Sequence, residues 1–286
     1  MTMKKHPAGG CNLPAGGCIA FIGGTGFYAA PFLEDPQEIL VETRYGPVRL
    51  LKGHKFDREI YFLSRHGAGH SVPPHLVNYR ANIAALKTLQ VQAIFAATAV
   101  GSLAEEMAPG HLVILDQFLD FTKARIGTFF QGEGFPVVHT DMSDPYCSFL
   151  RRELAGSAER LGFAFHSSGC YVCTEGPRFE SAGEIRMYGT LGGQVVGMTG
   201  VPEVVLAREA GICYAGISLV TNYAAGISPN PLSHEEVVEM MKKNGEHFLT
   251  LLMTALQTLP PQWDCSCEKR PEANLITTLP SSEAKG

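Results

Sequence analysis

The sequence lacks several features that would place it in whole classes of proteins. It has no uninterrupted run of about 18 apolar residues, so no membrane-spanning helix is predicted. It has no extended run of Lys or Arg, and its net charge is −5, which argues against a general nucleic-acid-binding surface but not against a pocket for a small anion. No apolar segment follows the lysines at the start as in a signal peptide, so we expect a cytoplasmic protein. No internal repeat is visible.

The composition is that of a folded protein that binds its ligands in pockets. Hydrophobic residues make up 45% of the 286 residues, which is ample for a core. In a reducing compartment, most of the eight cysteines are expected to be free thiols packed as small apolar residues. Cys170 and Cys173 lie on a predicted strand, where residues three apart face opposite sides. This argues against a shared metal or redox role for the pair. Cys265 and Cys267 leave open a strained disulfide or a metal site, although free thiols are favoured.

Predicted strands alternate with predicted helices along most of the chain. Short apolar runs bounded by Gly or Pro predict strands at 18–22, 39–43, 48–52, 59–63, 92–98, 111–115, 169–174 and 212–220. Helical periodicity and end signals predict helices at 73–90, 151–161, 201–210 and 233–258. This order indicates an α/β fold, a single domain with a central mixed β-sheet flanked by helices. We expect a flexible leader (1–17), the domain (18–260) and a C-terminal tail (261–286) without a clear element.

Polar residues follow several of the predicted strands, where ligands gather in open α/β sheets. The glycine loop 23–26, with Thr25, can direct backbone N–H groups at an anion. Arg65 offers a two-pronged donor for phosphate, with His66 as a second donor. Each also has an ordinary interpretation, as a tight turn, a surface Arg or a loop His. No Gly-Lys-Ser/Thr follows the glycine loop, which excludes a P-loop, and a third glycine of a dinucleotide site is absent.

Two further segments carry side chains suited to reading a planar heterocycle. Phe179 can stack on a ring, and Glu180 can accept paired N–H donors, although Glu180 also suits the start of a helix. Asn222 ends an apolar strand and offers both a donor and an acceptor, although Asn is common in turns. His66 and His70 are four residues apart, but the glycines between them argue against the helix that a metal site with this spacing would use.

Taken together, these segments resemble the trimeric purine nucleoside phosphorylase family, and especially its methylthioadenosine phosphorylase branch. The similarity runs from about Ile19 to about Leu259. The matching segments are 23–26, 64–67, 77–82, 98–103, 116–120, 174–179 and 197–203. The resemblance implies phosphorolysis, in which a nucleoside and phosphate give a free base and a sugar 1-phosphate. It also implies no metal and no organic cofactor, phosphate being a co-substrate, and a homotrimer or a dimer of trimers.

The resemblance also implies a role for individual residues. Asn222 and His66 are the expected catalytic residues. The residues expected to hold phosphate are Thr25, Arg65, His66, Thr98, Ala99 and Thr199. The residues expected to contact the base and the ribose are Phe179, Glu180, Met198, Asn222, Ala224 and His234.

One departure from the methylthioadenosine branch bears on the substrate. That branch has an Asp where this chain has Asn222, and an Asp suits the 6-amino group of adenine. An Asn amide can donate to the 6-oxo group of inosine or guanosine, while Glu180 can accept their N1–H. His234 matches the His that the 6-oxopurine enzymes direct at the 5′-hydroxyl, although an ordinary helix-surface position would also explain it.

The resemblance therefore favours a 6-oxopurine nucleoside phosphorylase acting in purine salvage, a pentosyltransferase. An S-methyl-5′-thioinosine or 5′-methylthioadenosine phosphorylase is the alternative within the family. A non-catalytic nucleotide-binding module that uses the glycine loop is the alternative from another class.

Overall fold

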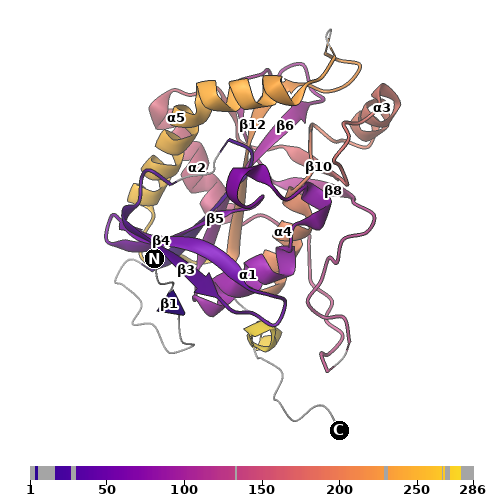
Figure 1. The fold of residues 1–286 in the computed structure, drawn as a ribbon. Coiled ribbons are helices and arrows are strands. Elements are labelled where there is room, and N and C mark those ends of the chain that lie inside the picture. The colour runs from indigo at the N-terminus through magenta and orange to yellow at the C-terminus, as the bar shows by residue number, and fades with distance from the viewer. Residues whose placement is uncertain are drawn as a thin grey trace.

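A mixed β-sheet forms the centre of the molecule (Figure 1). The computed structural model describes residues 4–5, 17–26, 30–132, 134–228, 231–265, 267 and 271–277. Within these residues the strands are β1 (Lys4–Lys5), β2 (Cys18–Gly23), β3 (Glu34–Val41), β4 (Val48–Lys55), β5 (Arg58–Ser64), β6 (Ala93–Ser102), β7 (Leu112–Ile114), β8 (Gln117–Phe121), β9 (Phe165–His166), β10 (Cys170–Thr174), β11 (Val195–Gly197) and β12 (Cys213–Tyr223). The helices are α1 (Tyr79–Thr88), α2 (Ser148–Leu161), α3 (Ala182–Thr190), α4 (Gly200–Glu209) and α5 (His234–Thr258), with 3-10 turns η1 (Ala68–His70), η2 (Pro74–Leu76) and η3 (Pro271–Thr277).

Strand β6 is the centre of the sheet. The strand order is β1-β3-β4-β5-β2-β6-β11-β10-β8, and β12 pairs with both β6 and β7. Strands β2, β5, β6 and β12 are mutually parallel neighbours, whereas β11 runs antiparallel to the end of β6. The carboxyl ends of the parallel strands therefore meet at one edge. The expected α/β fold with a mixed central sheet is confirmed.

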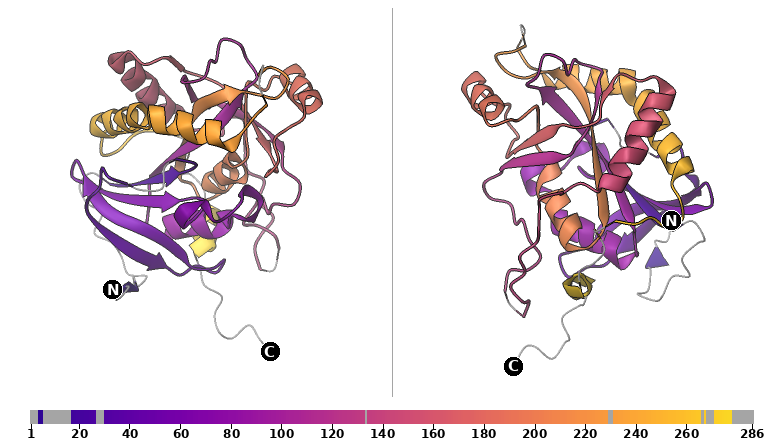
Figure 2. Two further views of the ribbon diagram at one scale, coloured as in Figure 1. Left: turned by 45° about the horizontal axis from the view of Figure 1, so that its top comes forward. Right: turned by 180° about the vertical axis from the view of Figure 1, so that it is seen from behind.

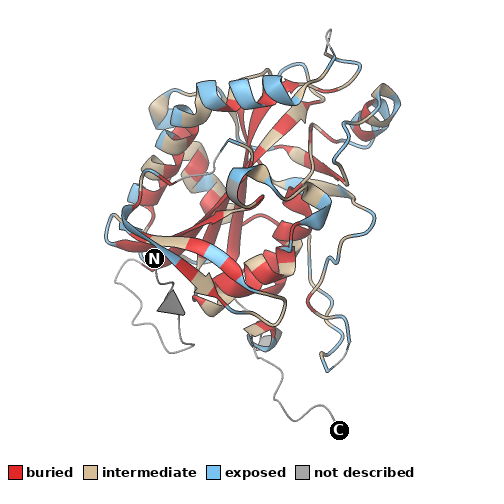
Figure 3. Ribbon diagram, viewed as in Figure 1, coloured by how far each residue is buried: buried red, intermediate tan, exposed pale blue. Residues whose placement is uncertain are grey.

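The central strands are largely buried (Figure 3), and the side chains on their two faces belong to two separate cores. Along β2, Cys18, Ala20 and Ile22 enter one core, while Ile19 and Phe21 enter the other, as strand alternation requires. Helices α1 and α4 cover the first face, and helices α2 and α5 cover the second (Figures 1 and 2). A strand covered on both sides has apolar residues at successive positions, which is why β2, β6 and β12 show as continuous apolar runs in the sequence.

Helix ends follow local side-chain chemistry. The Ser233 hydroxyl accepts a hydrogen bond from the Glu236 N–H, and so caps α5 as its sequence predicts. Ser181 and Glu184 form a reciprocal capping box at the start of α3. This box directs the chain out of the loop that carries Phe179 and Glu180.

Several local predictions are wrong, each for a local reason. The predicted helix 73–90 is divided, because Val77 is extended and the Asn78 side chain caps α1 at the Ala81 N–H. The strand predicted at 92–98 continues through Gly101 to Ser102 as β6. Strands β8 and β11 are not predicted, since they are short and carry a weak pattern.

The tail contains more structure than its sequence indicates. Residues 271–277 form η3, and Ala273 and Ile276 are buried. Cys267 is buried in the core beneath α2 and α5. The boundaries at 17/18 and 260/261 stay predictions, and most of the expected leader lies outside the described residues. In the described part of the chain, no helix is both long and apolar enough to cross a membrane.

Candidate active site

A cavity of about 420 Å³ opens where the carboxyl ends of the parallel strands meet. That volume is typical of a site for a small organic ligand. The structure brings all the predicted site residues to the wall of this cavity, although they come from loops far apart in sequence. They are Thr25, Arg65, His66, Thr98, Ala99, Phe179, Glu180, Met198, Thr199, Asn222, Ala224 and His234. Their individual roles in binding stay predictions.

Arg65 follows β5 and is held by a buried ion pair. Its Nε and Nη2 donate to the Glu203 carboxylate at 2.7 and 2.8 Å, and its Nη1 donates to the Ala97 carbonyl at 2.9 Å. Burial alone would lower the pKa of Arg65, but the adjacent Glu203 carboxylate outweighs burial and raises it, so the guanidinium is permanently charged. These bonds use three of the five N–H groups of the guanidinium, and the whole side chain is buried behind the cavity wall.

The glycine loop makes room for this guanidinium. A Cβ at Gly24 would lie 2.7 Å from the Arg65 Nη1 and 2.9 Å from the Ala97 carbonyl oxygen. Any other residue there would displace Arg65 or the β6 backbone at Ala97. Glycine is therefore required at position 24 because a larger residue does not fit.

His66 has a different hydrogen-bonding capacity from the one expected. Burial, and then the Arg65 charge, lower the pKa of His66 to about 4, so the ring is neutral at neutral pH. Its Nδ1 lies 2.8 Å from the Val72 carbonyl oxygen, which only a protonated Nδ1 can satisfy. The remaining Nε2 then carries a lone pair and accepts a hydrogen bond. Donation from Nε2 to phosphate, as predicted for His66, would need a second proton on the ring, and the role of His66 stays a prediction.

His70 also lines the cavity, although the sequence analysis considered it only as a metal ligand and argued against that role. The His66 and His70 ring centroids lie 4.2 Å apart, and the His70 and His234 centroids lie 5.6 Å apart. Gly67 and Gly69 adopt positive φ angles that turn the chain back, so that His70 returns over His66. The spacing of His66 and His70 was the available signal, but it reflects a glycine turn and not a helix face.

Asn222 is directed into the cavity by a bulge. The β12–β6 register shifts between Val220 and Asn222, so Thr221 is an extra residue. The Asn222 Nδ2 donates to the Tyr223 carbonyl at 2.9 Å, and the Oδ1 accepts from the Thr221 hydroxyl at 2.8 Å. These bonds fix the amide orientation and leave a second N–H on Nδ2. Gly101 lies opposite, where a Cβ would approach this Nδ2 to 3.3 Å.

Glu180 is the carboxylate in the cavity wall. Burial raises the pKa of Glu180, and a hydrogen bond from the Thr174 hydroxyl (2.6 Å) partly offsets that effect. The carboxylate retains acceptor positions toward the cavity because one hydroxyl occupies only one of its lone pairs. Phe179 lies beside it on the wall and is 39% exposed.

Thr98 on β6, and Met198 and Thr199 between β11 and α4, also line the cavity. The Thr98 hydroxyl lies 2.7 Å from the Ser218 hydroxyl on β12. Thr199 is the N-cap residue of α4, and its N–H donates to the Tyr171 hydroxyl at 3.1 Å. Met198 precedes it on the same wall.

Arg125 is a residue that the sequence analysis missed. It lies in the long connection between β8 and α2, which extends along one side of the molecule (Figure 2). Its guanidinium is almost fully buried and donates to four backbone carbonyls at 2.7–3.1 Å. These acceptors are the carbonyls of Thr174 and Glu175, at the end of β10, and of Met198 and Val201, between β11 and the first turn of α4. No local sequence motif marks such a role.

Comparison with known proteins places the chain in a family. The phosphorylase superfamily profile matches residues 18–257. A probable 6-oxopurine nucleoside phosphorylase of Dictyoglomus turgidum is 56% identical over 250 residues, which cover 87% of this chain and 95% of the relative. The 6-oxopurine nucleoside phosphorylase of Pyrococcus furiosus is 51% identical over 255 residues, covering 87% and 96%.

A solved structure agrees with these sequence matches. Methylthioadenosine phosphorylase from Schistosoma mansoni, in complex with adenine, superposes with a TM-score of 0.81 at 34% identity, covering 84% of this chain and 90% of that one. The profile match alone spans most of the chain. The chain belongs to the phosphorylase superfamily.

Proposed function

We propose that this protein is a purine nucleoside phosphorylase that cleaves 6-oxopurine nucleosides with phosphate to give the free base and ribose 1-phosphate. The 6-oxopurine relatives at 51–56% identity bear out the function expected from the sequence. The enzyme is accordingly a pentosyltransferase of purine salvage. Its substrates are a small nucleoside and inorganic phosphate.

The single observation that carries the specificity is the pairing of Glu180 and Asn222 in one cavity. Inosine and guanosine present an N1–H donor and a 6-oxo acceptor. The Glu180 carboxylate accepts the first, and the free Nδ2–H of Asn222 donates to the 6-oxo group or to N7. Adenine has no proton on N1 and would leave Glu180 facing an acceptor, a mismatch that costs discrimination on the order of 10⁴ when polar groups are buried.

The phosphate half of the site lies around Arg65. Thr25, Arg65, Thr98, Ala99 and Thr199 all line the cavity. Glu203 neutralises most of the Arg65 charge, so hydroxyls and backbone N–H groups supply much of the anion binding. The neutral His66 accepts a hydrogen bond, which suits a protonated phosphate oxygen or a ribose hydroxyl.

Cleavage of the glycosidic bond develops positive charge on the ribose and negative charge on the purine. The phosphate dianion stabilises the sugar cation and then attacks its anomeric carbon, and the bond electrons leave with the base. A preorganised donor at the place where negative charge develops lowers such a barrier by about 3–4 kcal/mol. Asn222 is that donor, because its amide is already fixed by Thr221 and Tyr223. Holding phosphate against the ribose adds an orientation advantage.

Methylthioinosine or methylthioadenosine phosphorolysis is the second candidate. The structural relative with adenine bound is a methylthioadenosine phosphorylase. His234 lies on the cavity wall beside His70, and two imidazoles suit a 5′-hydroxyl better than an apolar methylthio group. This favours the unmodified nucleosides.

Three further parts of the proposal concern the setting of the reaction. We propose that catalysis uses no metal and no organic cofactor, since phosphate and the described side chains supply each step above. We also propose a homotrimer or a dimer of trimers in the cytoplasm. Sedimentation velocity would distinguish a monomer from either assembly.

The test of the proposed function is base release from inosine, guanosine and 5′-methylthioadenosine, each with and without phosphate. Rapid phosphate-dependent release from inosine and guanosine is the expected result. A preference for 5′-methylthioadenosine would refute the base and 5′ assignments. Release without phosphate would indicate a hydrolase, and no release from any of the three would refute the activity.

A further inference from the structure

Four cysteines form a cluster that is remote from the active-site cavity. Cys213 is the first residue of β12 and Asn222 lies nine residues further along the same strand, which corresponds to about 30 Å of extended chain. The proposed phosphorolysis makes no use of this cluster.

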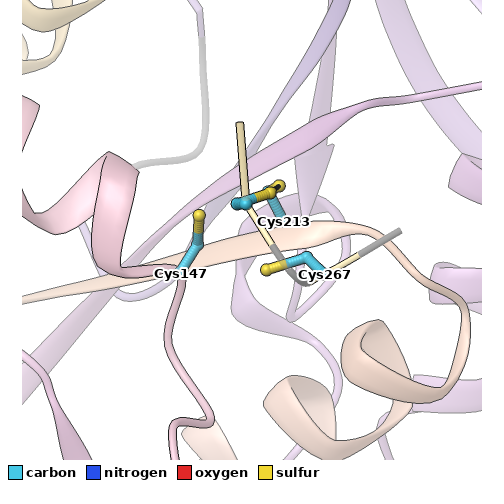
Figure 4. Close-up of side chains that lie close together, drawn as sticks. Cys147, Cys213 and Cys267 are labelled. Carbon is cyan, nitrogen blue, oxygen red and sulfur yellow. Dashed lines mark hydrogen bonds between the residues drawn. The ribbon is translucent and has the colours of Figure 1, made fainter. Parts of the chain in front are cut away.

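The four thiols come from three separate parts of the chain. Cys147 is the N-cap residue of α2, Cys213 begins β12, and Cys265 and Cys267 follow α5. All four Sγ atoms lie within 4.8 Å of one another. Figure 4 shows the Cys147, Cys213 and Cys267 side chains directed toward a common point. All four are free thiols, and the Cys213 and Cys265 sulfurs are 3.3 Å apart, well beyond a disulfide bond of about 2.05 Å.

We propose that Cys147, Cys213, Cys265 and Cys267 form a tetrathiolate site for a soft divalent cation, namely zinc. Four sulfurs in a tetrahedron with Zn–S bonds of about 2.3 Å stand about 3.8 Å apart. The observed separations of up to 4.8 Å reach that value by side-chain movements of about 1 Å or less. A site closed by four Cys ligands has no open position for substrate, so the ion has a structural role.

The surroundings of the cluster favour thiolates over disulfides. The Arg208 Nη1 donates to the Cys267 Sγ at 3.1 Å, and the Trp263 indole N–H donates to the Cys213 Sγ at 3.3 Å. Arg208 is only 6% exposed, so its cation offsets part of the net −2 charge of a zinc tetrathiolate. A disulfide sulfur carries no charge and would leave this buried guanidinium without an anionic partner among the residues that the structure describes. Such outer donors commonly accompany metal ligands and orient them.

The cluster also has a route to solvent and a function in the fold. A second cavity of about 230 Å³ is lined by Cys213, Cys265, Trp263, Gln92, Pro261 and Gln262, so an ion has access to the thiols. Binding joins α2, β12 and the tail segment at one point. Because the ion binds the folded chain and not the separated segments, its binding energy adds to stability.

Metal analysis of the reduced, untagged full-length protein tests this proposal. One zinc per chain is expected in the protein as purified, or after exposure of the metal-free protein to Zn²⁺ alone. Replacement by Co²⁺ should give the thiolate-to-metal charge-transfer and visible bands of tetrahedral cobalt. A zinc-free protein that takes up neither ion would overturn the proposal. So would a thiol titration in which four thiols are missing before reduction and appear only after it, because that result indicates two disulfides.

Variants connect the ion to these cysteines. Cys267→Ser and Cys147→Ser should each lose zinc or bind it at least about tenfold more weakly. The matched control is Cys170→Ser, a half-buried cysteine outside the cluster, which should retain the full metal content. A strong chelator should lower the Tm of the wild-type and of Cys170→Ser but not that of Cys267→Ser. Equal zinc content in all these proteins would refute the assignment, and the wild-type metal analysis remains decisive if a variant does not fold.

Discussion

Arg125 offers the sharpest test of how the loops around the cavity are held. Its guanidinium donates to the Met198 and Val201 carbonyls at 2.7 and 2.8 Å, and to two carbonyls at the end of β10 at 3.1 and 2.7 Å. Arg125→Met keeps much of the side-chain volume but removes every donor. A buried acceptor left without its donor costs about 1–3 kcal/mol.

The expected loss follows from these four acceptors. Using the low end of that range for each, because water can reach some of them, the free energy of unfolding should fall by about 4 kcal/mol. Urea-induced unfolding at fixed protein concentration measures this loss as a lower midpoint with an unchanged slope. The same loops carry Met198 and Glu180, so kcat/KM for inosine should also fall. The fold-decrease in kcat/KM should exceed the fold-increase in the KM for phosphate.

The matched control is Arg178→Met. Arg178 makes a bidentate pair with Glu184, but its side chain is 64% exposed. An exposed pair contributes little, so this variant should unfold close to the wild-type midpoint. If Arg125→Met and Arg178→Met unfold at the same urea concentration, the view that Arg125 organises the two loops is wrong.

Three further predictions concern the cavity itself. Asn222→Asp should shift the kcat/KM ratio from inosine toward adenosine by about tenfold or more; an unchanged ratio would remove Asn222 from base recognition. Glu203→Gln breaks the buried pair with Arg65 and should lower the free energy of unfolding by about 3 kcal/mol and raise the KM for phosphate, and a normal phosphate KM would contradict the positioning of Arg65. The pKa of His66 is lowered to about 4 by burial and Arg65, so between pH 6.5 and 4 the unfolded chain binds a proton that the folded chain does not. Stability should therefore fall by about 3 kcal/mol as the pH drops through that window, and His66→Gln, compared by urea unfolding at several pH values, should remove this part of the loss; an identical pH dependence would refute it.

The order of elements could be predicted from the sequence because the sheet is covered on both sides. Strands β2, β6 and β12 bury successive residues and so appear as apolar runs, whereas β8 is short and half exposed. The family motifs lie at strand ends for the same topological reason that brings the carboxyl ends of parallel strands together. Fold class and the set of cavity residues were therefore accessible from the chain.

Other features depend on contacts that no sequence pattern encodes. The bulge at Thr221 directs Asn222, and the Val72 carbonyl, six residues along the chain, fixes the proton on His66. Arg125 bonds to the backbone carbonyls of two segments far from it in the sequence.

The cysteines show the same division between sequence and tertiary structure. The sequence placed Cys265 and Cys267 close together in a tail that shows no clear element. Only the packing of that tail beside α2 and the start of β12 brings them to Cys147 and Cys213. Sequence determined which residues face the core and which end a strand, because both depend on local periodicity. The tertiary structure decided which polar atoms meet, because that depends on how the segments pack.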